Sequence, residues 1–119
     1  MDITRAKIRD LRKALDSKEI SAAELCGEYF KKIEAGDGKV QSYITVTKDK
    51  AMEMAANAQK RIDAGESAPL TGIPLAIKDN ICTDGIKTTC ASRMLENFIP
   101  PYLSLIHISE PTRLALISY

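Results

Sequence analysis

The chain has 119 residues, the length of one ordinary domain, with 45% hydrophobic and 28% charged residues. This composition is typical of globular proteins and excludes a disordered chain. The formal net charge is +1, so no overall field favours nucleic-acid binding. No run of about eighteen apolar residues and no signal-peptide pattern occurs, which predicts a protein without membrane segments.

The cysteine pattern predicts free thiols. Cys26, Cys82 and Cys90 cannot all pair with one another, no C-x-x-C occurs, and the single histidine, His107, is remote in sequence. We therefore expect a reducing, cytoplasmic environment, with neither a disulfide framework nor a zinc site.

The first predicted element is a short amphipathic helix. Ile8, Leu11 and Leu15 recur at intervals of three and four residues, and basic side chains lie between them. The charge runs Arg12-Lys13 and Lys31-Lys32 are typical of solvated helix faces.

A second helix is predicted to begin after Ser21, because Ser21 and Glu24 have the spacing of a capping box. Gly36 and Gly38 predict its C-terminal end. The residues predicted to share its buried face are Ala22, Leu25, Cys26, Tyr29, Phe30 and Ile33.

Residues 43–46, a tyrosine followed by three β-branched residues, predict a short strand. A helix is expected over residues 49–63, with Ala51, Met54, Ala55, Ala58 and Ile62 on one side; methionines at this spacing are core residues. Helices interspersed with strands predict an α/β fold.

Residues 70–80 contain Lys78, the candidate catalytic residue of this sequence. Residues 73–77 form a short apolar run that predicts a buried strand, with Pro74 at its beginning, where no ladder donor is needed. Lys78 follows directly, and its ammonium must reach solvent, pair with a carboxylate or lose its proton. On these residues alone a turn in which Lys78 pairs with Asp79 competes with a lysine that serves as a base toward a serine hydroxyl.

The flanking sequence makes the second interpretation specific. The stretch from residue 70 to residue 102 resembles the amidase-signature family around its catalytic lysine, and the helices before it extend the likeness to residues 1–102. The matching motifs are Gly72-Ile73-Pro74, Lys78-Asp79-Asn80, Ile81-Cys82-Thr83, Thr88-Thr89-Cys90-Ala91-Ser92, Leu95-Glu96-Asn97-Phe98 and Pro100-Pro101-Tyr102. The thiol-bearing motifs are similar to the branch formed by the A subunits of tRNA-dependent amidotransferases.

The resemblance implies a mixed central sheet flanked by helices, of which this chain holds the N-terminal part. It also implies catalysis by a lysine and two serines, in which the lysine, through the middle serine, activates the serine that attacks a carboxamide. Of that triad only Lys78 has a match here, so Lys78 is the predicted catalytic residue. Asp79 and Asn80 are expected to orient the strand end.

Three other residues are not predicted to be nucleophiles. Ser92 lies outside any glycine-rich loop, whereas the family's nucleophile lies in such a loop further downstream. Cys82 and Cys90 are predicted to be small buried hydrophobic residues, because no histidine is positioned to activate them.

The resemblance further implies hydrolysis of glutamine and transfer of ammonia to a partner B subunit that holds most of Glu-tRNA(Gln) and converts it to Gln-tRNA(Gln). ATP and Mg²⁺ would be used by that complex, a small C subunit would complete it, and this chain would bind no cofactor or metal itself. Two alternatives stay open: a stand-alone amidase of the same family acting on small carboxamides, and a non-catalytic helical interaction module.

Residues 103–119 do not fit the family, which would continue with an aspartate and a helix. They resemble the translation of a transposase-based sequencing adapter, so we expect them to be non-native. His107 and the alternation of Leu103 and Leu105 then have no functional meaning. We expect the chain to be a truncated, poorly folded and inactive fragment.

Overall fold

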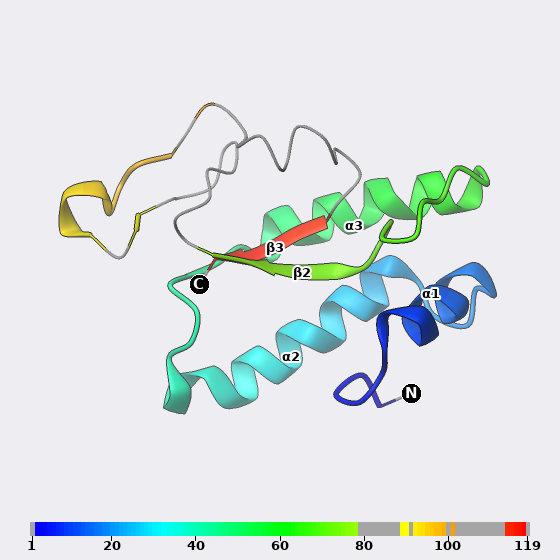
Figure 1. Cartoon of the computed structure of the whole chain (residues 1–119), viewed down its shortest axis with the longest axis horizontal. Coiled ribbons are helices and arrows are strands. Elements are labelled where there is room, and N and C mark those ends of the chain that lie inside the picture. The colour runs from blue at the N-terminus through cyan, green and yellow to red at the C-terminus, as the bar shows by residue number, and fades with distance from the viewer. Residues whose placement is uncertain (1, 79–88, 91, 100, 102–113, 119) are drawn as a thin grey trace.

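The computed structural model describes residues 2–78, 89–90, 92–99, 101 and, as backbone, 114–118 (Figure 1). The described elements are, in chain order, α1 (Ile8–Asp16), α2 (Ala22–Val40), β1 (Thr45–Val46), α3 (Lys48–Asp63), β2 (Pro74–Ile77), the 3-10 helix η1 (Arg93–Leu95) and β3 (Leu114–Ser118). The strands form one mixed sheet in the order β1-β3-β2. In the view of Figure 1 this sheet lies between α2 and α3. The predicted α/β class is confirmed.

Helix α1 forms where the periodicity predicts it. Leu11, Ala14 and Leu15 are buried, but Ile8 is 53% exposed, so its predicted place on the core face is wrong. Ile8 occupies the first turn of the helix, next to the preceding loop, and the core begins one turn later.

Helix α2 begins with the predicted capping box. The Ser21 hydroxyl accepts a hydrogen bond from the amide of Glu24 (3.2 Å), and the Glu24 carboxylate accepts one from the amide of Ser21 (2.9 Å). The predicted end at Gly36 and Gly38 is wrong, because the helix continues through both glycines to Val40. It ends instead at Gln41, whose φ of 53° is left-handed.

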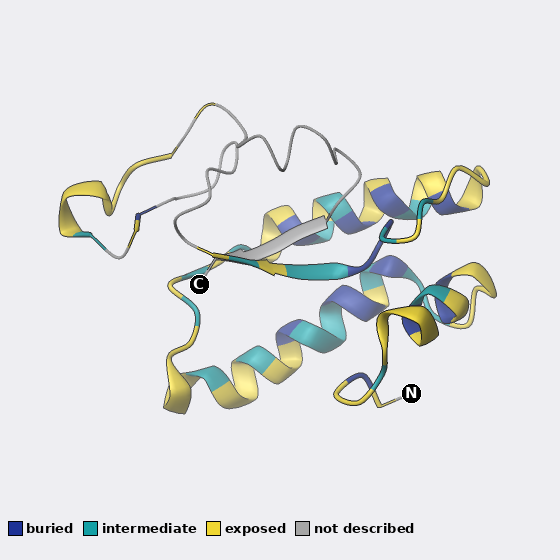
Figure 2. Cartoon of the chain, in the orientation of Figure 1, coloured by how far each residue is buried: buried dark blue, intermediate teal, exposed yellow. Residues whose placement is uncertain are grey.

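The core lies where α1, α2 and α3 meet the turn before β2 (Figure 2). The largest fully buried hydrophobic side chains of this core are those of Phe30, Leu15, Leu25 and Cys26. The small residues of α3 let α2 approach closely, and of the residues predicted for the buried face of α3, Ala51, Ala55, Ala58 and Ile62 are buried. Met54 is partly buried and packs against this core.

The strands are shorter and less covered than the sequence predicts. β1 keeps only the last two residues of the predicted strand. Ile73 is buried, but it precedes β2, whose own side chains are half-buried or exposed. The central strand β3 pairs antiparallel with β1 and parallel with β2, and it lies in the segment expected to be non-native.

Candidate functional site

Lys78 is the first residue after β2, and its side chain is exposed. The last ladder pair before it joins Ile77 to Ser118 of β3. Lys78 therefore stands at the carboxyl end of β2, while the strand paired with β2 here lies in the segment expected to be non-native. Asp79, with which Lys78 could pair, lies outside the described residues, so the alternatives for the Lys78 ammonium stay open.

The residues that the resemblance places around Lys78 fall mostly outside the described residues. This applies to Asp79, Asn80 and Cys82, and to His107 in the tail. The catalytic role of Lys78 is therefore not tested by the described residues and stays a prediction.

Cys90 and Ser92 are described, and one prediction about them is wrong. Cys90 is exposed rather than buried, and its φ of 50° is left-handed. The Ser92 hydroxyl accepts a hydrogen bond from the amide of Met94 (3.3 Å) and so caps η1, a structural role that needs no nucleophile.

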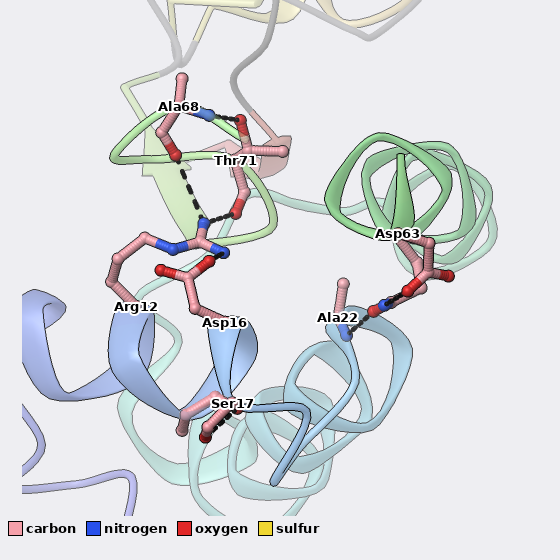
Figure 3. A network of polar contacts seen from close by, with 9 residues as sticks. Arg12, Asp16, Ser17, Ala22, Asp63, Ala68 and Thr71 are labelled. Carbon is pink, nitrogen blue, oxygen red and sulfur yellow. Dashed lines mark hydrogen bonds and ion pairs between the residues drawn. The ribbon is translucent and has the colours of Figure 1, made fainter. Parts of the chain in front are cut away.

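The predicted place of Arg12 on a solvated helix face is wrong. Its side chain is 14% exposed, whereas the adjacent Lys13 is exposed. The guanidinium reaches the turn before β2, where Nη1 donates to the carbonyl oxygens of Ala68 (3.3 Å) and Thr71, as Figure 3 shows. The pattern of one charge run could not reveal this contact, because the turn lies some sixty residues further along the chain.

The other arm of the guanidinium is bound by a carboxylate. Nη2 of Arg12 lies 2.6 Å from Oδ1 of Asp16, one turn later on α1. The hydrogen bond from Arg12 lowers the pKa of Asp16 below its ordinary value. The ion pair holds the guanidinium plane against α1 while its opposite edge binds the turn.

An open groove of about 380 Å³ lies between the C-terminal half of α2 and β2. Its lining is largely apolar and aromatic, with a few polar groups at its edge: Tyr29, Lys32, Ile33, Gly36, Asp37, Val40, Ser42, Tyr43, Pro74, Leu75 and Ala76. Burial raises the pKa of the Tyr29 hydroxyl. Asp37 accepts a hydrogen bond from the amide of Ser42 (2.7 Å), so this carboxylate already serves the end of α2.

Within the described residues, no cluster of three or more histidine, cysteine or acidic side chains is arranged to hold a metal ion. Over the same part of the chain, no helix combines the length and apolar character of a membrane span.

Sequence comparison identifies the relatives of this chain. The family model described as Amidase matches residues 24–107, more than half of the chain. The chain is 58% identical over 102 residues to the A subunit of glutamyl-tRNA(Gln) amidotransferase from Ruminiclostridium cellulolyticum, a match that covers 86% of this chain and 21% of that protein. The corresponding protein of Desulfosudis oleivorans is 55% identical over 95 residues, covering 80% and 20%. The chain thus spans about a fifth of the length of these curated relatives.

Solved structures of amidases share this fold. The native peptide amidase of Stenotrophomonas maltophilia superposes with a TM-score of 0.87 at 26% identity, over 97% of this chain and 24% of the amidase. A bacterial aryl acylamidase of the amidase-signature family superposes with a TM-score of 0.82 at 24% identity, over 95% of this chain and 24% of that one, which supports the fold alone. Together with the family match, these likenesses show that the chain belongs to the amidase-signature family.

Proposed function

We propose that this chain is the N-terminal part of the A subunit of a glutamyl-tRNA(Gln) amidotransferase. The observation that carries the proposal is the 58% identity over 102 residues to a protein of that name. The whole protein would hydrolyse glutamine and deliver ammonia to a B subunit, which, with ATP and Mg²⁺, converts Glu-tRNA(Gln) to Gln-tRNA(Gln). A C subunit would complete this cytoplasmic complex.

In this proposal Lys78 is the catalytic base of a Ser-Ser-Lys triad whose serines belong to the remainder of the protein. The support for this role is its position, because β2 ends one residue before Lys78 and presents it at the edge of the sheet. Only a neutral amine can accept a proton, so in this proposal the remainder of the protein supplies the surroundings in which Lys78 takes the proton of a serine hydroxyl. One of the two serines would then attack the carboxamide, and ammonia would leave.

The test uses the full-length protein in complex with its partner subunits, with release of glutamate from glutamine as the assay. Lys78→Ala should lower kcat by about 10²-fold or more, the usual contribution of a general base. Lys78→Arg should be equally inactive, because a guanidinium keeps its proton. The control is Lys60→Ala, on the exposed side of α3, which should keep wild-type activity.

Two results would contradict the assignment of Lys78 as the catalytic base. Activity retained by Lys78→Arg would show that the residue supplies only charge, and activity retained by Lys78→Ala would remove it from the mechanism.

A stand-alone amidase is the second candidate, and the superposition on a peptide amidase favours it. The higher identity to amidotransferase subunits, 58% against 26%, makes it the weaker proposal. The two differ in what the isolated full-length protein does. A stand-alone amidase hydrolyses small carboxamides without any partner, whereas the amidotransferase component needs its partners for transamidation.

We also propose that the 119-residue chain is itself poorly folded and inactive, and that residues 103–119 are adapter read-through. The family model ends at residue 107, so residues 108–119 of the tail lie beyond it. Sequencing the genomic DNA past the codon for Tyr102 should give an aspartate and a helix-forming segment. Genomic DNA that encodes residues 103–119 as they stand would show that the tail is native.

A further inference from the structure

We propose that Arg12 is a positioning residue for Lys78. The inference rests on the proposed function of Lys78 and adds a residue on α1 to it. Arg12 binds the turn at residues 68–72, this turn leads into β2, and β2 ends at the residue before Lys78. Because Arg12 fixes the position where β2 begins, it also fixes the position of Lys78 at the end of that strand.

The first step is the contact between Arg12 and the turn (Figure 3). One nitrogen, Nη1, donates to two carbonyl oxygens of the turn, those of Ala68 and Thr71, while Nη2 is held by Asp16. The planar guanidinium therefore binds α1 on one side and the turn on the other. A fork with fixed donor directions sets the orientation of its acceptors, which the single charge of a lysine does not do.

The second step is the rigidity of the turn. The Thr71 side chain is fully buried, and its hydroxyl accepts a hydrogen bond from the amide of Ala68 (3.0 Å). The amide of Thr71 donates to the carbonyl of Ala68 (3.1 Å), and that of Ile73 donates to the carbonyl of Leu70 (3.1 Å). A turn closed by these bonds moves as one body, so a contact at its carbonyls orients the strand that follows.

The third step is that stability alone gives a weak reason for this arginine. The side chain is mostly buried, and its Nε–H has no hydrogen-bond partner among the described residues. An unpaired buried donor opposes folding, so it offsets part of the stability that the other hydrogen bonds of Arg12 provide. A directional role explains a guanidinium here where a contribution to stability does not.

The fourth step is how far a small tilt of β2 at the turn displaces Lys78. A strand rises about 3.3 Å per residue, so Lys78 lies about 20 Å along the chain from Gly72, and a tilt of about 3° at the turn displaces Lys78 by about 1 Å. A misplacement of about 1 Å can cost about 10²-fold in rate.

The test compares Arg12→Lys, Arg12→Met and the matched control Lys13→Met in the full-length protein in complex with its partners. Arg12→Lys keeps the charge and one donor, Arg12→Met keeps the length, and Lys13 is the exposed neighbour on the same helix. We expect both Arg12 variants to lower kcat for glutamine hydrolysis by about tenfold or more, with KM nearly unchanged, because positioning acts on the reacting groups. Lys13→Met should match the wild type.

A second readout does not depend on activity. Mass spectrometry gives the rate at which an amine-selective reagent modifies Lys78, with Lys60 as the internal reference. A displaced Lys78 should react at a rate at least about twofold different from that in the wild type, while Lys60 is unchanged. If the full-length protein has no glutaminase activity, the proposed function fails, and this rate still decides the role of Arg12.

The inference is overturned if Arg12→Lys keeps both the wild-type kcat and the wild-type Lys78 reaction rate. It is also overturned if the variants lower only the thermal midpoint, with kcat and the Lys78 rate intact at temperatures where they are folded. Should Arg12→Met fail to fold, the result for Arg12→Lys decides.

Discussion

The turn before β2 depends on Gly72, which combines a positive φ with a close approach to three helices. Its φ is +81°, and a Cβ built on it would lie 3.2 Å from Cδ1 of Ile62, 3.4 Å from Cβ of Ala22 and 3.5 Å from Cδ1 of Leu15. Three helices thus meet at one backbone position. A side chain at Gly72 would need both a strained backbone and a shift of the helix junction.

Gly72→Ala is expected to destabilise the full-length protein by about 1–3 kcal/mol, because alanine is strained in the left-handed region and meets Ile62. The control is Gly36→Ala, in α2, where a Cβ meets nothing within 4 Å. This change should stabilise the helix by about 0.5–1 kcal/mol. The thermal unfolding midpoint should therefore fall for the first variant and hold or rise for the second. Equal midpoints for the two variants would contradict the close approach at Gly72.

At the scale of elements, the N-terminus of α2 is held by the reciprocal bonds of Ser21 and Glu24. The hydrogen bond from the backbone of Ser21 lowers the pKa of the Glu24 carboxylate below its ordinary value of 4.5. The folded state thus prefers ionised Glu24. The stabilisation that this group gives is present above the ordinary value and is lost as the pH falls through the lowered, folded-state value.

Glu24→Gln should therefore lower the thermal midpoint of the full-length protein at neutral pH, and the difference from the wild type should shrink once the pH falls below the folded-state pKa of Glu24. Ser21→Ala removes the other half of the box and should cost about 0.5–2 kcal/mol. Glu53→Gln, on the exposed side of α3, serves as the control and should change neither the midpoint nor its pH dependence. A Glu24→Gln difference that grows toward acid pH would reverse the sign and refute the capping role.

Helix α2 shows why local patterns predict its start and not its end. A capping box is a contact between residues three apart, so the sequence contains all of it. A glycine stops a helix only when it adopts a positive φ, and Gly36 and Gly38 remain helical. The end comes instead at Gln41, whose amide donates to the carbonyl of Asp37 (2.6 Å).

The sequence likewise predicts one part of the candidate site and not another. The apolar run of residues 73–77 predicts Lys78 directly after a strand, and the structure confirms this position, while the catalytic role that the family likeness implies stays a prediction. The contact of Arg12 could not be predicted because its partners, Ala68 and Thr71, are distant in the chain and are backbone carbonyls, which carry no sequence signal. The predicted burial of Cys90 is wrong because its apolar character could not reveal a left-handed turn.

At the scale of the whole molecule, the described core is confined to one end. It joins the three helices to Ile73, while Val40, Ile44 and Val46 are 71%, 51% and 48% exposed around the far end of α2 and the start of β1. The groove between α2 and β2 lies open beside them. A chain that spans a fifth of its relatives therefore leaves apolar surface uncovered, which favours association or loose packing.

The labelling rate of the Cys26 thiol measures how often this core opens. Cys26 is fully buried, and burial raises the pKa of its thiol. Because the thiolate is the reactive form, a folded core should label slowly. In the full-length protein, Cys26 should react with a thiol reagent about 100-fold or more slowly in native buffer than in concentrated urea. In the 119-residue chain the two rates should be similar, since a loose core opens often.

Cys90 provides the reference within the same 119-residue chain, because it is exposed and should label quickly with or without urea. The comparison separates two states that an activity assay cannot distinguish, since under the proposed function both a folded and an unfolded fragment lack the catalytic serines. Strong protection of Cys26 beside a reactive Cys90 would mean that the three helices and the turn at Gly72 fold on their own. The inactivity of the fragment would then follow from its missing nucleophile alone.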